Sequence, residues 1–240
     1  MPNTVAQLKL AVAGFMQRDP AVFVRGSFDL LLQACNNARL YAERKVDFEL
    51  AHVAVDLPHT DPLNGVDLSA AVLHGTATAV RVKKIISPFL ANTDGGQFPV
   101  DLWTKRRWND KLKRRFERGH HHMHSGTPQK HFVESPFVVV QDGTTLFVVP
   151  VDSKMFSAPF TIYLDAIRWL PPYVTGSEND FLLDNCFDWL MFYSISQMNF
   201  FLKEDERVVM SESVLKDTWD ALVKWNTELL QTATDDVDLD

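Results

Sequence analysis

The sequence has little cysteine and no long apolar run. Only Cys35 and Cys186 occur in 240 residues. Both lie in helix-like apolar patterns, which disfavours a disulfide framework and indicates small core residues in a protein made in a reducing cytoplasm. A transmembrane helix needs about 18 consecutive apolar residues, and the longest apolar-rich run, 181–202, is interrupted by Asp, Asn, Ser and Gln. We therefore expect no membrane partner.

The short motifs of common catalytic centres are also missing. The sequence contains no G-x-S-x-G, H-E-x-x-H, Gly-rich phosphate loop or Cys-x-x-Cys. Its adjacent carboxylates, at 204–206 and 235–236, lie in a polar turn and an acidic tail, where solvation is the rule. Both cysteines are far in sequence from the histidines that a catalytic thiolate would need. We expect a protein that is not an enzyme and holds no cofactor.

A histidine-rich segment, 119–130, is the main candidate for metal binding. It contains His120, His121, His122 and His124. Imidazole is a good ligand for zinc, nickel and copper, but a natural site fixes its ligands by secondary structure and by hydrogen bonds around them. Adjacent histidines on a loop offer neither, so the sequence favours a solvated or partner-contacting loop over a metal site.

The net charge of −7 is unevenly distributed. Within residues 105–118 only Asp110 and Glu117 oppose eight basic residues, so this segment carries +6 and the rest of the chain −13. The basic residues are Lys105, Arg106, Arg107, Lys111, Lys113, Arg114, Arg115 and Arg118. They are candidates for a subunit interface or for contact with DNA.

Three aromatic residues decide between two interpretations of the basic segment. Trp103, Trp108 and Phe116 could stack on nucleic-acid bases. Their spacing of five and eight residues also fits one side of a helix, which favours packing in the core with the charges on a solvated or interface face.

Periodicity predicts helices at both ends of the chain and strands between them. The expected helices cover 4–18, 27–45, 101–118, 180–202 and a segment from 211 onward, the first, second and fourth capped by Thr4, Ser27 and Asp180. The expected strands cover 48–57, ending at Pro58, and 76–86, ending at Pro88, as well as 137–140, 145–149 and 160–170. Residues 141–144 contain Asp-Gly, a strong hairpin signal.

These elements predict an α+β protein, a helical bundle built from both termini with an inserted β-rich middle domain. The bundle comprises residues 1–46 and 177–231. The insertion, 47–176, contains the basic helix 101–118 and the His-rich loop 119–130, and residues 232–240 form an acidic tail.

The most specific pattern lies in residues 163–209, where a strand ends near Pro171-Pro172 and an acid-capped helix leads into the last helix. Its matching positions are Leu182, Leu183, Asn185, Asp188, Leu190, Tyr193, Phe201, Leu202, Lys203, Glu204, Asp205, Glu206 and Arg207. The hairpin 137–150 and the opening helix pair, with Asn36-Asn37-Ala38, are also similar. On these residues the chain resembles the adaptor (head-tail connector) family of tailed bacteriophages. The segments 101–118 and 119–130 depart from the family pattern.

The resemblance implies a structural virion protein. Its copies would form a ring, typically of twelve subunits, that joins the portal of the head to tail or tail-tube proteins. Genomic DNA would pass through the lumen. The implied location is the virion neck, after assembly in the host cytoplasm. Two alternatives stay open: another neck or tail component, such as a tail terminator or tube gatekeeper, and a nucleic-acid-binding module centred on 105–118.

The C-terminal helices contain more aromatic residues than one amphipathic stripe can hide. Some are therefore candidates for subunit contacts, and a large core is the alternative for any one of them. The candidates for contacts within the bundle or between subunits are Trp189, Phe192, Phe200, Phe201, Trp219 and Trp225.

Overall fold

The computed structural model describes residues 3–59, 65–91, 97–110, 138–149, 160–202 and 205–235. The chain divides into two compact units. Unit 1 comprises Met1–Leu50 and Pro171–Asp240, and unit 2 comprises Ala51–Leu170. Each unit has its own packed interior.

Unit 1 is helical with a short hairpin and a 3-10 turn near its start. Its elements are α1 (Val5–Phe15), η1 (Pro20–Phe23), β1 (Val24–Arg25), β2 (Phe28–Asp29), α2 (Leu30–Lys45), α4 (Phe181–Asn185), α5 (Phe187–Leu202) and α6 (Asp205–Asp235). The first helix confirms the sequence prediction at its start, but it ends at Phe15 instead of Arg18. Thr4 caps it, and the Gln7 side chain accepts a hydrogen bond from the Thr4 backbone N–H to complete a capping box.

The second helix begins three residues later than predicted. Asp29, not Ser27, is its N-cap, because the Asp29 carboxylate accepts from the Leu32 N–H at 3.0 Å. Ser27 instead lies in the turn between β1 and β2, where Gly26 adopts a left-handed φ of 61°. Ser27, which the sequence pattern predicted as the helix N-cap, therefore belongs to a tight turn instead.

The C-terminal helices also differ from the prediction in their boundaries. The expected helix 180–202 is broken at Cys186 into α4 and α5, although Asp180 caps its start as predicted. The last helix begins at Asp205 rather than Ser211 and continues to Asp235, inside the expected tail. It contains 31 residues, a length of about 46 Å.

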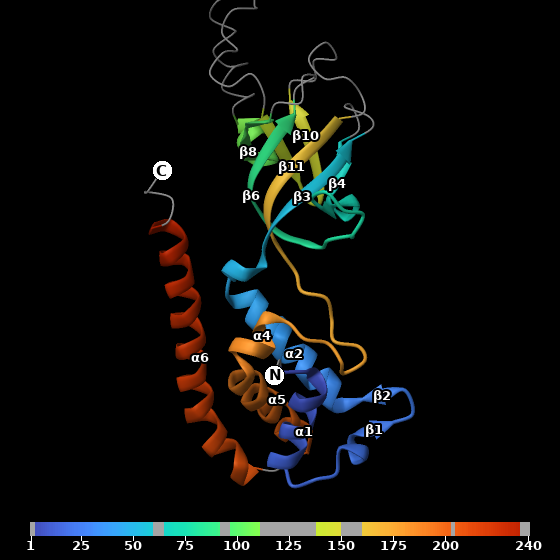
Figure 1. Ribbon diagram of the computed structural model, residues 1–240, viewed down its shortest axis with the longest axis vertical. Helices are drawn as coiled ribbons and strands as arrows, with labels where there is room; N and C mark the ends of the chain where they lie inside the picture. The colour runs from blue at the N-terminus through green and yellow to red at the C-terminus, as the bar shows by residue number, and fades with distance from the viewer. Residues whose placement is uncertain are drawn as a thin grey trace, which may run out of the picture. The chain divides into compact units, whose positions relative to one another are not determined.

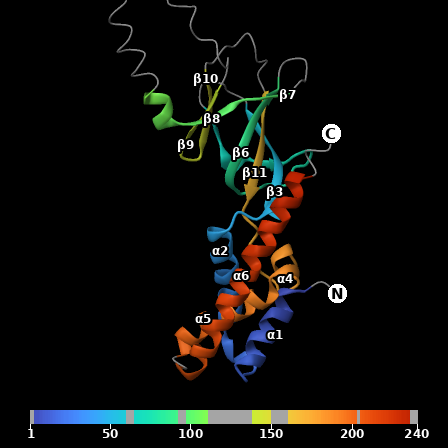
Figure 2. The same cartoon turned by 90° about the vertical axis from the view of Figure 1, so that its left-hand side faces the viewer.

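The predicted helical bundle built from both termini is wrong. The protein is mixed α+β with three sheets. In unit 1, α1, α2 and α5 pack on one another, whereas α6 packs chiefly along α5, and a two-stranded sheet is part of the unit (Figures 1 and 2). The apolar periodicity predicted that these segments are helices, but it could not predict which helices pack on one another. In the structure α6 packs mainly on α5.

Unit 2 consists of two larger sheets. Its strands are β3 (His52–His59), β4 (Val66–Asp67), β5 (Val72–Leu73), β6 (Val82–Ala91), β7 (Gln97–Pro99), β8 (Asp101–Thr104), β9 (Val138–Asp142), β10 (Thr145–Val149) and β11 (Phe160–Arg168), and it contains the 3-10 turn η3 (Leu68–Ala70). A further 3-10 turn, η2 (Glu49–Ala51), spans the last residues of unit 1 and the first of unit 2. One sheet has the order β5-β3-β11-β6-β7 and the other β4-β10-β9-β8. All pairs are antiparallel except β8 with β9.

The strands of unit 2 confirm several local predictions. The β9–β10 hairpin forms around the predicted Asp-Gly turn, with Gly143 at a φ of 63°. The predicted strand near 160–170 is β11.

Two prolines do not end their strands as predicted. Pro58 pairs with Thr161 within β3, and Pro88 pairs with Leu164 within β6. The other neighbours of these strands pair only beside the prolines, β5 at Val55 and Asp56 and β7 at Phe89–Ala91. Each proline therefore occupies a place where one side of the strand is not in a ladder, and a missing N–H is tolerated there.

The predicted basic helix 101–118 is wrong at its start. Residues 101–104 form β8, which pairs in parallel with β9, and residues 105–110 are helical. Pairing with a strand distant in sequence overrides the local helical period. The remainder of this segment, the His-rich loop 119–130 and residues 236–240 of the acidic tail lie outside the described residues.

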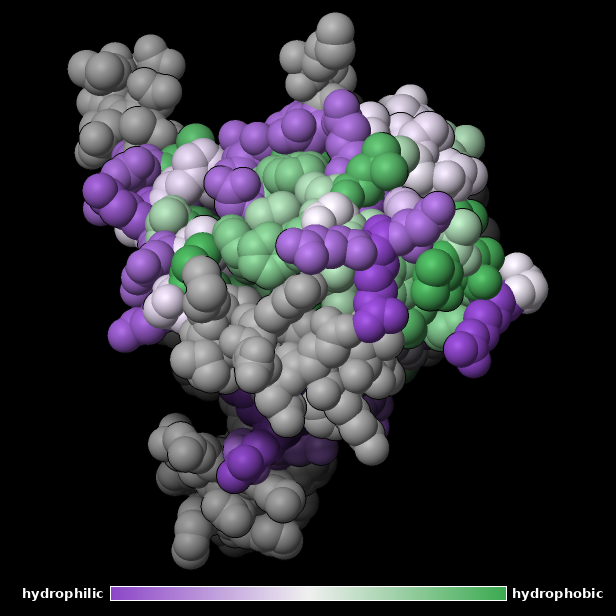
Figure 3. Space-filling model, turned by 90° about the horizontal axis from the view of Figure 1, so that it is seen from below, coloured by the Kyte–Doolittle hydropathy of each residue, from purple (hydrophilic) through white to green (hydrophobic). Residues whose placement is uncertain are grey.

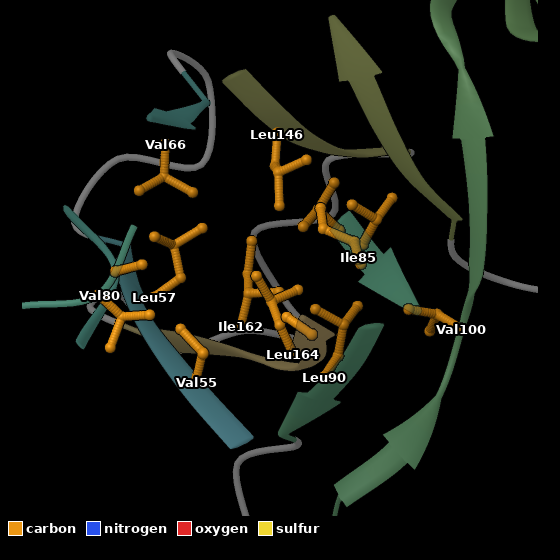
Figure 4. Close-up of a cluster of buried hydrophobic side chains, with 14 residues drawn as sticks. Val55, Leu57, Val66, Val80, Ile85, Leu90, Val100, Leu146, Ile162 and Leu164 are labelled. Atoms are coloured by element: carbon orange, nitrogen blue, oxygen red, sulfur yellow. The ribbon is translucent and has the colours of Figure 1, made fainter. Parts of the chain in front are cut away.

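The core of unit 2 lies between its two sheets. Side chains from both sheets point toward one another there (Figure 4). Its fully buried members include Leu57 of β3, Leu90 of β6, Leu146 of β10 and Ile162 of β11. Alternate residues of these strands face inward, as expected for strands buried on one face.

Candidate functional site

Several strongly exposed apolar side chains of unit 1 gather in its N-terminal part. Leu10 of α1 is 60% exposed, Val22 of η1 59% and Phe28 of β2 54%. Phe15 and Val24 are exposed as well. These five residues are called the α1–hairpin surface here. Figure 3 shows apolar residues gathered at this end of unit 1 with hydrophilic residues around them. Exposed apolar area of this kind typically marks a contact with another protein.

The α1–hairpin surface is held in place by contacts beneath it. Lys9 of α1 forms an ion pair with Asp29, at the end of β2. Phe23 is buried and anchors η1, and Phe15 packs edge-to-face on Phe192 of α5 at 5.9 Å between ring centroids. The hairpin is thus fixed to the helices, so its apolar side chains are presented on a rigid support.

Four aromatic rings join α2, α5 and α6 inside unit 1. Trp189 lies 5.1 Å from Tyr193 and 5.2 Å from Trp219 between ring centroids. Tyr41 of α2 contacts all three rings. The cluster holds α6 onto the rest of the unit, with a gain for aromatic pairs beyond burial alone.

The predicted aromatic contact residues divide into several groups. Trp189 is buried and Trp219 half-buried in the aromatic cluster, so both make contacts within the unit. Phe192 packs on the α1–hairpin surface, and Trp225 is half-buried on α6. The side chains of Phe200 and Phe201 lie outside the described part of the chain.

A second anchor of α6 was not predicted. Asn226 is buried, its Oδ1 accepts from the Glu49 N–H at 3.0 Å, and its Nδ2 donates to the Asp47 carbonyl at 3.0 Å. One amide thus satisfies two backbone groups of the segment that follows α2. The only signal in the sequence is a polar residue on the apolar side of the helix.

A buried polar network fixes the segment that enters unit 1 after β11. Asn36 of α2 bonds the Tyr173 backbone in both directions, at 2.9 Å each. The Tyr173 hydroxyl donates to Asp180 at 3.0 Å, and the Arg39 guanidinium lies 5.7 Å from the Tyr173 ring centroid. Arg39 is itself paired with Glu43.

Burial shifts the ionisation of this network. It raises the pKa of Tyr173, and the Asp180 charge adds to that effect. Burial likewise raises the pKa of Asp180, against the hydrogen bonds that it accepts. Perturbed groups often mark functional sites, but ion-pair networks that hold structure shift pKa values in the same way. Here Asn36 and Arg39 of α2 both contact Tyr173, so the arrangement is suited to holding this segment on α2.

The basic segment begins on the surface of unit 2. Lys105 pairs with Asp142 of β9, and the Arg107 guanidinium lies 4.6 Å from the Trp103 ring centroid. Lys105, Arg106 and Arg107 are exposed, as an interface or DNA contact requires. Lys111, Lys113, Arg114, Arg115 and Arg118 lie outside the described residues.

The two described aromatics of this segment pack inward. Trp103 is only 6% exposed, and Trp108 packs near it at 6.1 Å between ring centroids. Val138 and Val140 of β9 complete the same cluster. Trp103 is buried and Trp108 partly buried against it, so neither indole offers a fully open platform for bases, which supports the core interpretation of these residues. Phe116 is not described.

The cysteines are buried thiols, as predicted from their apolar patterns. Cys35 and Cys186 are both free and buried, and burial raises the pKa of each to about 12. A thiol with a raised pKa is a poor nucleophile at neutral pH. Among the residues that the structure describes, no group of three or more His, Cys, Asp or Glu side chains could hold a metal ion.

Comparison with known proteins identifies no relative of this chain. No model of a known protein family matches the chain, and no curated protein matches it. Within the described part of the chain, no helix is both long and apolar enough to cross a membrane.

Proposed function

We propose that this chain is one subunit of the adaptor ring that joins the portal of a phage head to its tail, in the neck of the virion. DNA passes through the lumen of this ring. The proposal rests on the resemblance in residues 163–209 and on the α1–hairpin surface. That surface is the structural observation that carries it, since a subunit needs a fixed apolar face for its neighbours.

The distribution of charge supports assembly from several copies. Unit 1 has ten Lys and Arg against twenty Asp and Glu, a net charge of −10. Unit 2 has fourteen Lys and Arg residues against eleven Asp and Glu residues, a net charge of +3. Opposite charges on two parts of one subunit steer copies into a head-to-tail arrangement, and such an arrangement closes into a ring when its rotation divides a full turn.

The nucleic-acid-binding alternative draws less support from the described residues. It needs exposed aromatics beside the basic residues, and Trp103 and Trp108 pack against β9 instead. A ring with basic residues at its lumen still attracts DNA without sequence preference. Weak, salt-sensitive DNA binding is therefore part of the proposal.

Native mass spectrometry of the purified chain, alone and mixed with purified portal ring, tests the proposal. We expect a cyclic assembly of about twelve copies, as in the family that the chain resembles, when portal is present. Val22→Ser combined with Phe28→Ser should remove that assembly, because it removes apolar contact area. Ile86→Ser is the matched control, since Ile86 is an exposed apolar residue of unit 2. A chain that stays monomeric with portal contradicts the proposal.

A further inference from the structure

A ring built from one kind of subunit needs two different surfaces on opposite sides of that subunit. In unit 1, α6 lies on one side and the β1–β2 hairpin on the other, with α1, α2 and α5 between them (Figure 1). When the α6 side faces the viewer, α6 lies in front of these helices (Figure 2). The hairpin and α6 are therefore placed as the two ends of a head-to-tail contact.

The outward side of α6 carries an exposed stripe. It follows the spacing i, i+4, i+7, i+11 and i+14, which aligns residues along one ridge of a helix. The ridge consists of Lys216, Asp220, Val223, Thr227 and Leu230. All five are exposed, and Val223 and Leu230 are each 38% exposed, two turns apart. Unit 1 thus leaves two apolar side chains of α6 partly exposed beside its packed side.

The hairpin carries matching chemistry. Val24 and Phe28 are exposed apolar residues, and Arg25 pairs with Phe28 across the two strands. Arg25 is a cation beside apolar area, and Asp220 is an anion one turn before Val223. Throughout the described ranges, neither Arg25 nor Asp220 has an ion-pair partner within its own chain.

We infer that the β1–β2 hairpin of one copy docks on the α6 ridge of the next copy. Phe28 and Val24 cover Val223 and Leu230, and Arg25 pairs with Asp220. The apolar contact supplies most of the binding free energy, while the ion pair sets the register and direction of the contact. This inference rests on the proposed ring and names the two surfaces from which the ring is built.

Disulfide trapping tests the contact even when association is weak. The full chain with Arg25→Cys and Asp220→Cys is oxidised at high concentration and run on a non-reducing gel. The β1–β2 hairpin and α6 lie on opposite sides of unit 1 (Figure 1), and both native cysteines are buried, so a bond joins separate copies. We expect a ladder of linked chains at least severalfold stronger than with Arg25→Cys and Asp217→Cys, because a disulfide forms only where the two Cβ atoms come within about 4.5 Å of each other. Asp217 is exposed on the same helix but off the ridge.

Charge reversal supplies an independent readout. We expect Arg25→Glu alone and Asp220→Arg alone to lower assembly about tenfold, and the chain carrying both changes to regain it. Asp217→Arg is the control with the same change of charge. Circular dichroism verifies that each variant is folded.

The outcomes separate this inference from the function on which it rests. If the wild-type chain forms a ring but the Arg25–Asp220 cysteine pair links no better than the control, the hairpin–ridge contact is wrong and the proposed function stands. If the wild type forms no ring and no ladder, both are wrong. Equal assembly of the single and double charge variants also overturns the contact.

Discussion

Arg39 and Glu43 form an ion pair in the interior of unit 1, one helical turn apart on α2. Arg39 Nη1 donates to Glu43 Oε2 at 2.6 Å, and both side chains are buried. The pair also places the Arg39 guanidinium against the Tyr173 ring. The segment that enters unit 1 after β11 therefore packs, through Tyr173, against a charged pair on the buried side of α2.

Removing one partner of this pair should be costly. Arg39→Met leaves the Glu43 carboxylate buried without its cation, and we expect the free energy of unfolding to fall by about 3–5 kcal/mol. The double variant, which combines Arg39→Met with Glu43→Leu, should lose much less, because no charge is left uncompensated. Urea unfolding measures both, and a double variant less stable than the single one contradicts this account.

Glu178 should give the protein a stability that depends on acid pH. Its carboxylate accepts from the backbone N–H groups of Val174, Thr175 and Gly176 at 2.7, 2.5 and 2.6 Å. Burial opposes ionisation, but these bonds outweigh it and lower the pKa of Glu178 from 4.5 to about 2. Because the folded pKa is lower, the contribution is fully present above about pH 4.5 and is lost as pH falls toward 2.

The Gln variant isolates this contribution. We expect Glu178→Gln to lower the urea midpoint at pH 6 and the difference from wild type to close as pH falls from 4.5 toward 2. Glu228→Gln is the control, since the Glu228 side chain is 62% exposed and should change stability by less than about 0.5 kcal/mol. A difference that does not vary with pH means that the carboxylate charge plays no part.

Local patterns predicted those elements whose cause is local. The capping box of Thr4 and Gln7 and the Asp-Gly turn at Gly143 each depend on a few adjacent residues, and both formed as expected. Residues 101–104 have a helical apolar period, yet they pair with β9, which begins 37 residues after β8 does. Such pairing depends on partners that a local window does not contain.

The candidate site was harder to predict for a related reason. The aromatic-rich C-terminal helices suggested contact residues, but Trp189 proved to be buried among α2, α5 and α6. The exposed residue Val22 lies in the 3-10 turn η1 and Phe28 in the short β1–β2 hairpin, and both elements are too short for periodicity to recognise. Which apolar residues remain exposed is decided by how the elements pack, so it can be read only from the folded chain.

Trp103 distinguishes a core residue from a base-stacking residue. It packs with Val138, Val140 and Trp108 and is nearly buried. Trp103→Ala should therefore lower the free energy of unfolding by about 3–5 kcal/mol. Binding to a DNA fragment, measured below the unfolding transition across a salt series, should keep its salt slope, because the slope reports phosphate contacts. Lost DNA binding with unchanged stability would favour base stacking.

Asn226 should control how firmly α6 is held. Asn226→Ala removes the two hydrogen bonds to the Glu49 N–H and the Asp47 carbonyl, and each lost hydrogen bond costs about 0.5–1.5 kcal/mol. Hydrogen exchange should then accelerate along residues 213–231 more than in α1 or α2, because α6 has fewer other anchors in the unit. Lys224→Ala on the exposed side of α6 is the matched control, since its 3.7 Å pair with Glu228 contributes only a few tenths of a kcal/mol, roughly 0.2–0.5. Equal acceleration in both variants means that α6 is held by its aromatic cluster with Tyr41 and Trp189, and that the Asn226 amide only fills space.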